Sequence, residues 1–367
     1  MKFNIKRDSS EKPLYVEATI KASDSSYMDL LNFYFRPQEV LKDDFEKIFP
    51  KNPDYLPNHE NITSTREFLP WNGWIFRGMQ KAEYRLRTSF ERQFFNNLFT
   101  EDQRIIKEMG LIREFQRKSK FLDPELTNIP LDDTYEYMAK FQHHGGATRF
   151  LDASFSYFIA LFFALWKTDF KKQEIIIPKI QDENCNNDSH IESNKCAIWC
   201  FNRMWIEKTY KKMLPQRITE LYEKIDKFGK DTRIQKEVLT YSSTLKKNGG
   251  DYKNEFCSVI NMTPYFMNSR TIRQRGTFLI PTNPYRTFEE NLFNMVHSDS
   301  DAYRILKINI EYTNETLLFL RKCLDEMNIN YSVLFDGLDN MCLDIVERAK
   351  IPGDTVIVSP NAGIGHN

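Results

Sequence analysis

The chain has 367 residues, of which 41% are hydrophobic and 14% aromatic, and this content excludes a wholly disordered protein. Its 51 basic and 51 acidic residues give a formal net charge of zero, which argues against a general electrostatic binder of nucleic acid or membrane, although a local basic patch stays open. The six cysteines are scattered and no signal-like segment is present, so we expect reduced thiols in a cytoplasmic protein with no membrane association.

The first 70 residues predict little regular structure. Alternation over residues 14–20 predicts a strand, and Ser25 with Ser26 favours the start of a short helix that ends near Leu31. Prolines recur through residues 36–73, so this stretch is predicted to be mostly connection with few regular elements. We expect residues 1–70 to pack on the core that the rest of the chain forms.

Residues 74–141 predict a buried strand followed by helices. The apolar run from Trp74 to Met79 is typical of a buried strand, which ends at Gly78. Thr100 and Gln103 have the spacing of a capping box. The apolar residues that follow share one face of a helix, namely Ile105, Met109, Ile112 and Phe115. A further helix is predicted from about Asp133 to Phe141.

Residues 142–166 change character at their midpoint. The first half, to Ser154, is polar and contains glycine, whereas the second half is apolar except for Ser156. This predicts a loop or short strand that leads into a buried helix, with Asp152 or Ser154 as the N-cap. The helix is too short to cross a bilayer, which needs about 20 residues. Its positive N-terminal end would favour a phosphate among Thr148, Arg149 and Asp152.

The C-terminal half mixes strands and helices. Strands are predicted at 173–180, 196–201, 276–280, 303–312 and 355–358, and helices at 315–327 and 338–349. Residues 181–195 are predicted to form a polar loop, and residues 203–250 have a helical pattern that Pro215 interrupts. We therefore predict one α+β domain over residues 71–358, with a mixed central sheet, a helical insertion at 203–250 and a tail at 359–367.

Four blocks of residues resemble the FRG domain family. The first block is Phe76-Arg77-Gly78. The second is matched by Gln142, His143, Gly145, Thr148, Arg149, Leu151 and Asp152, and leads into a helix with Ala160, Leu161, Phe163 and Ala164. The third is Gln274-Arg275-Gly276-Thr277-Phe278, and the fourth is Leu334–Asp339, without the family's proline. Their order implies an FRG domain, and we expect the first three blocks to converge on one pocket, because buried polar residues need partners.

Each candidate residue of these blocks also has a structural interpretation. Arg77, at the exit of a buried strand, is either paired with a carboxylate or free to bind an anion. Gly78 permits a positive φ or the close approach of a ligand. Arg149 and Asp152 could pair with each other, and Thr148 and Ser154 could serve as cap and turn hydroxyls.

No metal site or nucleophile is expected from the sequence. His143 and His144 lack further ligands at a suitable spacing, and Cys196 and Cys200 lack the second cysteine pair of a zinc site. No P-loop, dinucleotide fingerprint or nucleophile elbow is present, so ATP-dependent phosphoryl transfer and serine or cysteine hydrolysis are disfavoured.

The block order is also similar to that of ADP-ribosyltransferases of the Arg–Ser–Glu type, and this resemblance implies an ADP-ribosyltransferase-like fold. It implies that Arg77 holds a phosphate or ribose of NAD, with Gly78, His143, Thr148, Arg149 and Ser154 contributing to the NAD site. Gln274 would stand in the segment that normally carries the catalytic glutamate, but Gly276 occupies the glutamate's own position. Either Asp152 substitutes from another direction, or the chemistry is lost.

Two hypotheses about function follow. The first is an enzyme that consumes NAD as a substrate, an ADP-ribosyltransferase acting as a toxin or antiphage effector on a macromolecular acceptor, protein or RNA/DNA, with an antitoxin or regulatory protein as a further partner. Its expected catalytic residues are Asp152, Arg77 and Gln274. The second is a non-catalytic module that binds a nucleotide or protein in the same pocket. An acid at the nicotinamide-ribose end would favour the enzyme, and a pocket filled by the protein's own side chains would favour the module.

Overall fold

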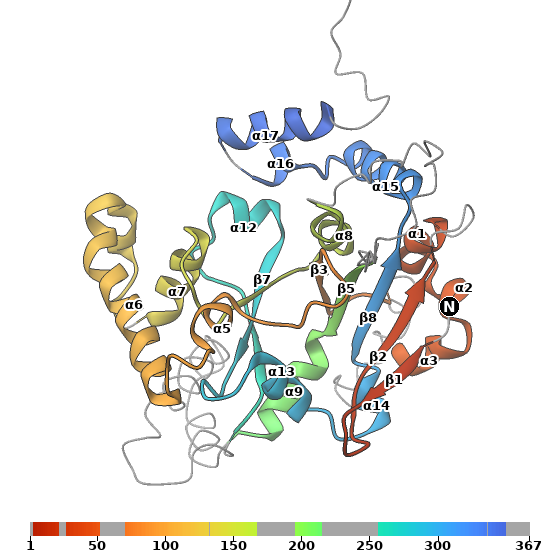
Figure 1. The fold of residues 1–367 in the computed structure, drawn as a ribbon, viewed down its shortest axis with the longest axis horizontal. Helices are drawn as coiled ribbons and strands as arrows, with labels where there is room; N and C mark the ends of the chain where they lie inside the picture. The colour runs from red at the N-terminus through yellow and green to blue at the C-terminus, as the bar shows by residue number, and fades with distance from the viewer. Residues whose placement is uncertain are drawn as a thin grey trace, which may run out of the picture.

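One central sheet organises the computed structural model, which describes residues 3–21, 27–51, 70–131, 133–166, 195–214, 256–335 and 337–349. Within these residues eight strands lie side by side in the order β1-β2-β8-β5-β3-β4-β7-β6 (Figure 1). β2 and β8 run parallel, and the other neighbouring pairs run antiparallel. The prediction of an α and β fold with a mixed central sheet is therefore confirmed.

The described strands include several that the sequence predicted, among them the short strand expected before the buried helix, and two that it did not. Their bounds are β1 Asn4–Arg7, β2 Pro13–Ile20, β3 Trp74–Met79, β4 Leu151–Ser154, β5 Lys195–Asn202, β6 Val259–Met262, β7 Gly276–Pro281 and β8 Ile305–Glu311. β1 and β6 were not predicted, and they form the two edges of the sheet. Both are four residues long, and so short a strand gives little periodicity to detect before its partner is known.

Helices cover the sheet and its ends (Figure 1). Their bounds are α1 Tyr27–Phe35, α2 Pro37–Leu41, α3 Phe45–Ile48, α5 Ser89–Phe94, α6 Glu101–Leu122, α7 Thr134–His143, α8 Tyr157–Leu165, α9 Arg203–Lys212, α12 Ser269–Arg273, α13 Phe288–Asn294, α14 Asp299–Ala302, α15 Asn314–Glu326, α16 Tyr331–Leu334 and α17 Leu338–Ala349. The expectation of mostly connection after residue 36 is wrong for residues 37–48. Pro37 stands in the first turn of α2, where its missing N–H is not needed.

The apolar helix α8 lies against β3, β5 and β4, and most of its residues are buried as predicted. Its N-cap is Ser156, whose side chain accepts a hydrogen bond from the Ile159 N–H. The prediction of Asp152 or Ser154 as the cap is wrong, because both belong to β4, which ends before the helix begins. A bend at Phe155 and Ser156 separates the two elements.

Gly78 allows α8 to pack closely on β3. A Cβ atom at this position would lie 1.9 Å from the Ala160 carbonyl oxygen and 2.6 Å from the Ala164 nitrogen, both backbone atoms of α8. Gly78 does not have a positive φ, so one structural interpretation of this glycine is wrong. The close approach that the sequence suggested is made by a helix of the same chain.

The α6–α7 hairpin flanks the sheet beside β7 (Figure 1). The capping box of Thr100 and Gln103 is present, which confirms that prediction. Ile105 and Ile112 are buried, whereas Met109 is 42% exposed, so the apolar face that these residues share is only partly covered. α7 then leads to Gly145, whose φ of +85° turns the chain toward β4.

Several predictions lie outside the described residues. These are the strand at 173–180, most of the loop at 181–195, the strand at 355–358, the tail at 359–367 and the insertion at 203–250 beyond residue 214. The described start of that insertion, α9, is helical as predicted. In the described part of the chain, no helix is both long enough and apolar enough to span a membrane.

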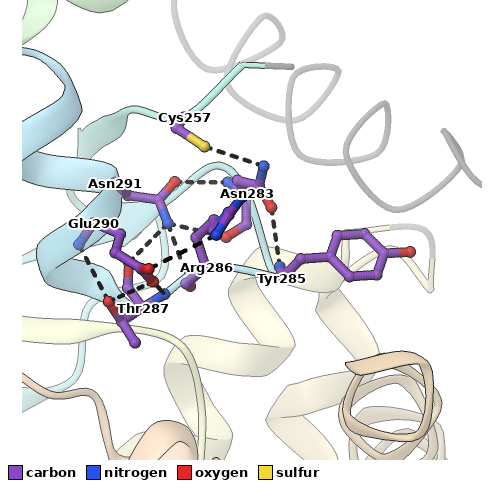
Figure 2. A network of polar contacts seen from close by, with 7 residues as sticks. All are labelled: Cys257, Asn283, Tyr285, Arg286, Thr287, Glu290 and Asn291. Carbon is purple, nitrogen blue, oxygen red and sulfur yellow. Dashed lines mark hydrogen bonds and ion pairs between the residues drawn. The ribbon is translucent and has the colours of Figure 1, made fainter. Parts of the chain in front are cut away.

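A buried polar network orders the loop between β7 and α13 (Figure 2). The Asn291 amide donates to the carbonyls of Asn283, Arg286 and Thr287, and the Asn283 amide donates to the Cys257 sulfur. Thr287 also caps α13 in a capping box with Glu290. These bonds fix the N-terminal end of α13, which in turn contacts α5 next to the candidate site described below.

Candidate functional site

A pocket of about 530 Å³ opens beside the middle of the sheet. Its walls come from β3, β4, β7, α5, α7, α8 and α12 and from the loops next to them. Its lining includes polar, charged and aromatic residues, among them Arg77, Gly78, Arg92, Lys140, Gln142, His143, Asp152, Ser154, Phe266, Arg270 and Gln274. The volume lies in the range of about 300–1,000 Å³ that is typical of small-molecule sites.

The pocket forms where two central strands diverge. β3 pairs with β5 along its whole length, but it pairs with β4 only through Phe76 and Ser154. Beyond that pair the two backbones separate. The Arg77 side chain reaches into the gap, and its Nη1 donates to the Asp152 carbonyl at 2.5 Å. The divergence thus leaves space next to polar groups at the centre of the fold.

The structure brings the three predicted blocks together. Arg77 and Gly78 from the first block, His143, Asp152 and Ser154 from the second, and Gln274 from the third all line the pocket. These residues are separated by up to almost 200 positions in the chain. The expected convergence on one pocket is therefore confirmed, while the catalytic and binding roles assigned to these residues stay predictions.

Arg77 has a partly satisfied guanidinium. Its Nη1 lies 3.9 Å from a carboxylate oxygen of Asp152, and its Nε is buried with no hydrogen-bond partner in the described residues. Burial lowers the pKa of Arg77, the charge of Asp152 opposes this, and the nearby charge of Arg92 lowers it further. Arg77 thus contacts Asp152 and still keeps an N–H donor without a partner in the described residues. Pairing with a carboxylate and binding of an anion are therefore compatible roles for this residue.

A hydrogen-bonded chain sets the orientation of Asp152. The Thr148 hydroxyl donates to the Gln142 side-chain oxygen, and the Gln142 amide nitrogen donates to the Asp152 carboxylate at 2.7 Å. The Asp152 side chain is 65% exposed and is the one carboxylate among the described residues that line the pocket. It is held at one end and open at the other, as a carboxylate that meets a ligand would be.

Thr148 and Arg149 do not line this pocket. Thr148 is fully buried and bonds to α5, with Ser89 Oγ donating to its carbonyl and its own N–H donating back to Ser89 Oγ. Arg149 forms a buried, two-pronged ion pair with Glu108 of α6. The suggestion that Arg149 pairs with Asp152 is wrong, because Arg149 is directed to α6 instead.

The side chains of Ser154 and Gln274 both donate to backbone carbonyls of the protein. The Ser154 hydroxyl donates to the Gln274 carbonyl at 2.7 Å, and the Gln274 amide donates to the Leu334 carbonyl at 3.1 Å. Gly276, which pairs with Ser154 across β4 and β7, offers no side chain, and a Cβ there would face Thr271. The side-chain donors of Ser154 and Gln274 therefore form hydrogen bonds within the protein, on the wall of the pocket made by β4 and the start of β7.

Three cationic residues of the pocket were not predicted from the sequence. They are Arg92 of α5, Lys140 of α7 and Arg270 of α12, whose guanidinium lies 4.5 Å from the ring centre of Phe335. The sequence does contain a pattern that predicts α5, the helix that carries Arg92. Thr88 and Glu91 have the spacing of a capping box, and Thr88 caps this helix in the structure. Nothing in the sequence places these cations beside Arg77, because only the tertiary fold joins their helices.

One carboxylate holds an aromatic loop at the pocket mouth. Both side-chain oxygens of the buried Glu136 accept backbone N–H bonds, from Tyr265 at 2.7 Å and from Phe266 at 3.2 Å. Phe266 then lines the pocket, while Tyr265 is exposed to solvent. Rings and cations together suit a ligand that has a planar, apolar part and negative charge.

The geometry agrees with the family comparison. A model described as FRG domain matches residues 72–173, a span that holds β3, α5 to α8 and β4. Residues 72–173 therefore match an FRG domain, as the first two motif blocks indicated, and the third block of the pocket lies outside the matched span. No curated protein and no solved structure is significantly similar to the chain.

A conservative change at Arg77 tests its part in binding. In Arg77→Lys the charge remains but the planar fork for bidentate contacts is lost, so we expect a folded protein with at least about tenfold weaker nucleotide affinity. Titration calorimetry with NAD, together with thermal melting, checks this. A variant that is destabilised but keeps its nucleotide affinity at low temperature would show that Arg77 serves only to join β3 and β4.

Glu91 of α5 predicts a pH effect on stability. Burial raises the pKa of Glu91 to about 7, even though its carboxylate accepts the Phe288 N–H at 2.7 Å, and its second oxygen is buried with no partner in the described residues. The folded state thus binds a proton that the unfolded chain releases near its ordinary value of 4.5. The proton on Glu91 therefore stabilises the folded state. This contribution to the free energy of unfolding is fully present below pH 4.5 and is lost as the pH rises through about 7.

In Glu91→Gln we expect this part of the pH dependence to disappear. The wild type should lose on the order of 1–3 kcal/mol of unfolding free energy between pH 5 and 8 relative to the variant. Urea denaturation at several pH values measures the difference, with the exposed Glu83→Gln as the control. Parallel pH profiles for wild type and Glu91→Gln would contradict the assignment.

Proposed function

We propose that the chain is an NAD-dependent enzyme of the ADP-ribosyltransferase type, acting as a toxin or antiphage effector on a macromolecular acceptor, protein or nucleic acid. The observation that carries the proposal is the meeting of Arg77, Asp152 and Gln274 in one pocket with further cations. Two phosphates of NAD need cations, its rings need apolar walls, and its ribose needs a carboxylate when nicotinamide leaves. The described walls supply groups of all three kinds.

The chemistry requires little beyond positioning and charge. The bond between nicotinamide and ribose breaks with its electron pair going to nicotinamide, and an acceptor atom bonds to the ribose carbon and loses a proton. Positive charge builds on the sugar during this step, so a nearby carboxylate lowers the barrier. Asp152 is our candidate for that carboxylate because Gln142 orients it and Gly276 offers no side chain.

A specific observation favours a second function, a non-catalytic nucleotide- or partner-binding module. Ser154 and Gln274 donate to protein carbonyls, and no carboxylate of β7 faces the pocket at Gly276. Against the module, the described side chains leave the pocket open. We therefore rank the enzyme first.

Incubation with NAD labelled in its adenylate part separates the two functions. The enzyme should release nicotinamide and leave label on protein or nucleic acid of a cell extract. Retention of intact NAD, with no label on any macromolecule, would favour the module. A variant of Asp152, described in the Discussion, serves as the inactive control.

A further inference from the structure

Two arginines from different elements face the same pocket. Arg77 comes from β3 and Arg92 from α5. Arg77 donates to the Asp152 carbonyl, and its Nε has no partner in the described residues. Arg92 donates from Nη1 to the Arg87 carbonyl at 2.8 Å. A guanidinium carries five N–H donors, so each arginine keeps donors that a ligand could use.

The helix that carries Arg92 is firmly held. Ser89 exchanges hydrogen bonds with the backbone of Thr148, and the Phe90 N–H donates to the Thr148 carbonyl at 3.0 Å. Glu91 accepts from Phe288 at the start of α13. The threonine of the FRG motif therefore acts outside the pocket, where it docks α5 and fixes the position of Arg92.

Among the described lining residues, the cations Arg77, Arg92, Lys140 and Arg270 outnumber the carboxylates. Arg77 and Arg92 line the same pocket, and the charge of Arg92 lowers the pKa of Arg77. The one lining carboxylate, Asp152, stays 3.9 Å from Arg77. One carboxylate among these cations leaves an excess of positive charge in the pocket, which favours an anionic ligand.

We propose that Arg77 and Arg92 together form a subsite for a diphosphate group. The pocket should then prefer ligands with two linked phosphates over monophosphates and nucleosides, since two forks can each bind phosphate oxygens. The subsite lies in the pocket that we propose for NAD, and it would hold the two phosphates of that molecule. Binding to it needs no turnover, so it is measured separately from catalysis.

Calorimetric titration of the whole chain with inorganic pyrophosphate, ADP-ribose, AMP and adenosine tests the subsite. In Arg92→Gln, affinity for pyrophosphate and ADP-ribose should fall by about tenfold to a hundredfold, the range for losing a charge-assisted contact. Affinity for adenosine should stay the same. The matched control is Arg117→Gln on α6, which removes an exposed arginine outside the pocket and should change nothing.

Each other outcome overturns the subsite. Unchanged pyrophosphate affinity in Arg92→Gln removes Arg92 from it, and equal losses in Arg92→Gln and Arg117→Gln would show general electrostatics only. A parallel loss of adenosine affinity would make Arg92 structural, and a wild type that binds no phosphate compound has no such site. If phosphate binding follows the expectation while nicotinamide is never released, the subsite stands and the proposed enzyme falls.

Discussion

Replacing Asp152 by asparagine is expected to lower NAD turnover by about a hundredfold or more, the scale of removing one electrostatic stabiliser. Asparagine keeps an oxygen that can accept from Gln142, so the side chain should retain its place. The position is 65% exposed, and its loss of charge should leave stability almost unchanged. Affinity for NAD should persist, because the cations that we propose for its phosphates are untouched.

Nicotinamide release at saturating NAD, measured beside an NAD titration, checks this expectation. Asp43→Asn, an exposed acid outside the pocket, is the control and should behave as the wild type. Full turnover in Asp152→Asn would clear the residue of a catalytic role. A wild type that releases no nicotinamide with any acceptor would instead favour the binding module.

The second large effect concerns stability. In Arg149→Met the buried carboxylate of Glu108 loses its partner, and we expect a cost of about 3–5 kcal/mol, as for other broken buried ion pairs. Adding Glu108→Gln should recover part of this, because the amide carries no charge to bury. Urea denaturation of both variants and the wild type measures the difference.

The same variants test the sequence-based role of Arg149. Since Arg149 is directed to α6 and away from the pocket, nucleotide affinity measured below the melting temperature should be unchanged in Arg149→Met. Lost affinity in a variant that is still folded would return Arg149 to the ligand site. A destabilisation below about 1 kcal/mol would place the ion pair among weak, solvent-screened ones.

Local pattern determined most of the larger elements. The apolar run of α8, the capping box of α6 and the alternation of β8 are properties of neighbouring residues, and all three appear in the structure. The N-cap of α8 was misplaced by two residues or more, because Asp152, Ser154 and Ser156 are all good caps and only strand pairing decides where β4 ends. Edge strands β1 and β6 were missed because each has only four residues, too few to show a period-2 pattern before the partner strand is known.

For the candidate site too, the sequence identified some features and only the fold decided others. The motif residues were identifiable from the sequence because they bring polar and charged groups to the ends of apolar segments, where they need partners. The partner of each motif residue could not be identified from the sequence. Arg149 pairs with Glu108 of α6, whereas Arg77 pairs with Asp152. The local sequence does not distinguish the two pairings, which depend on the fold placing Glu108 of α6 beside Arg149.

By itself, then, the sequence determined that this chain holds an FRG domain with a mixed sheet, a buried helix and polar blocks that share a site. The tertiary structure alone decided that β3 and β4 diverge to open the pocket, that Thr148 holds α5, and that Arg92 stands beside Arg77. The physical reason is range. Periodicity and capping act within a few residues, whereas this pocket is made by side chains from segments that lie from tens of residues to almost 200 residues apart in the chain.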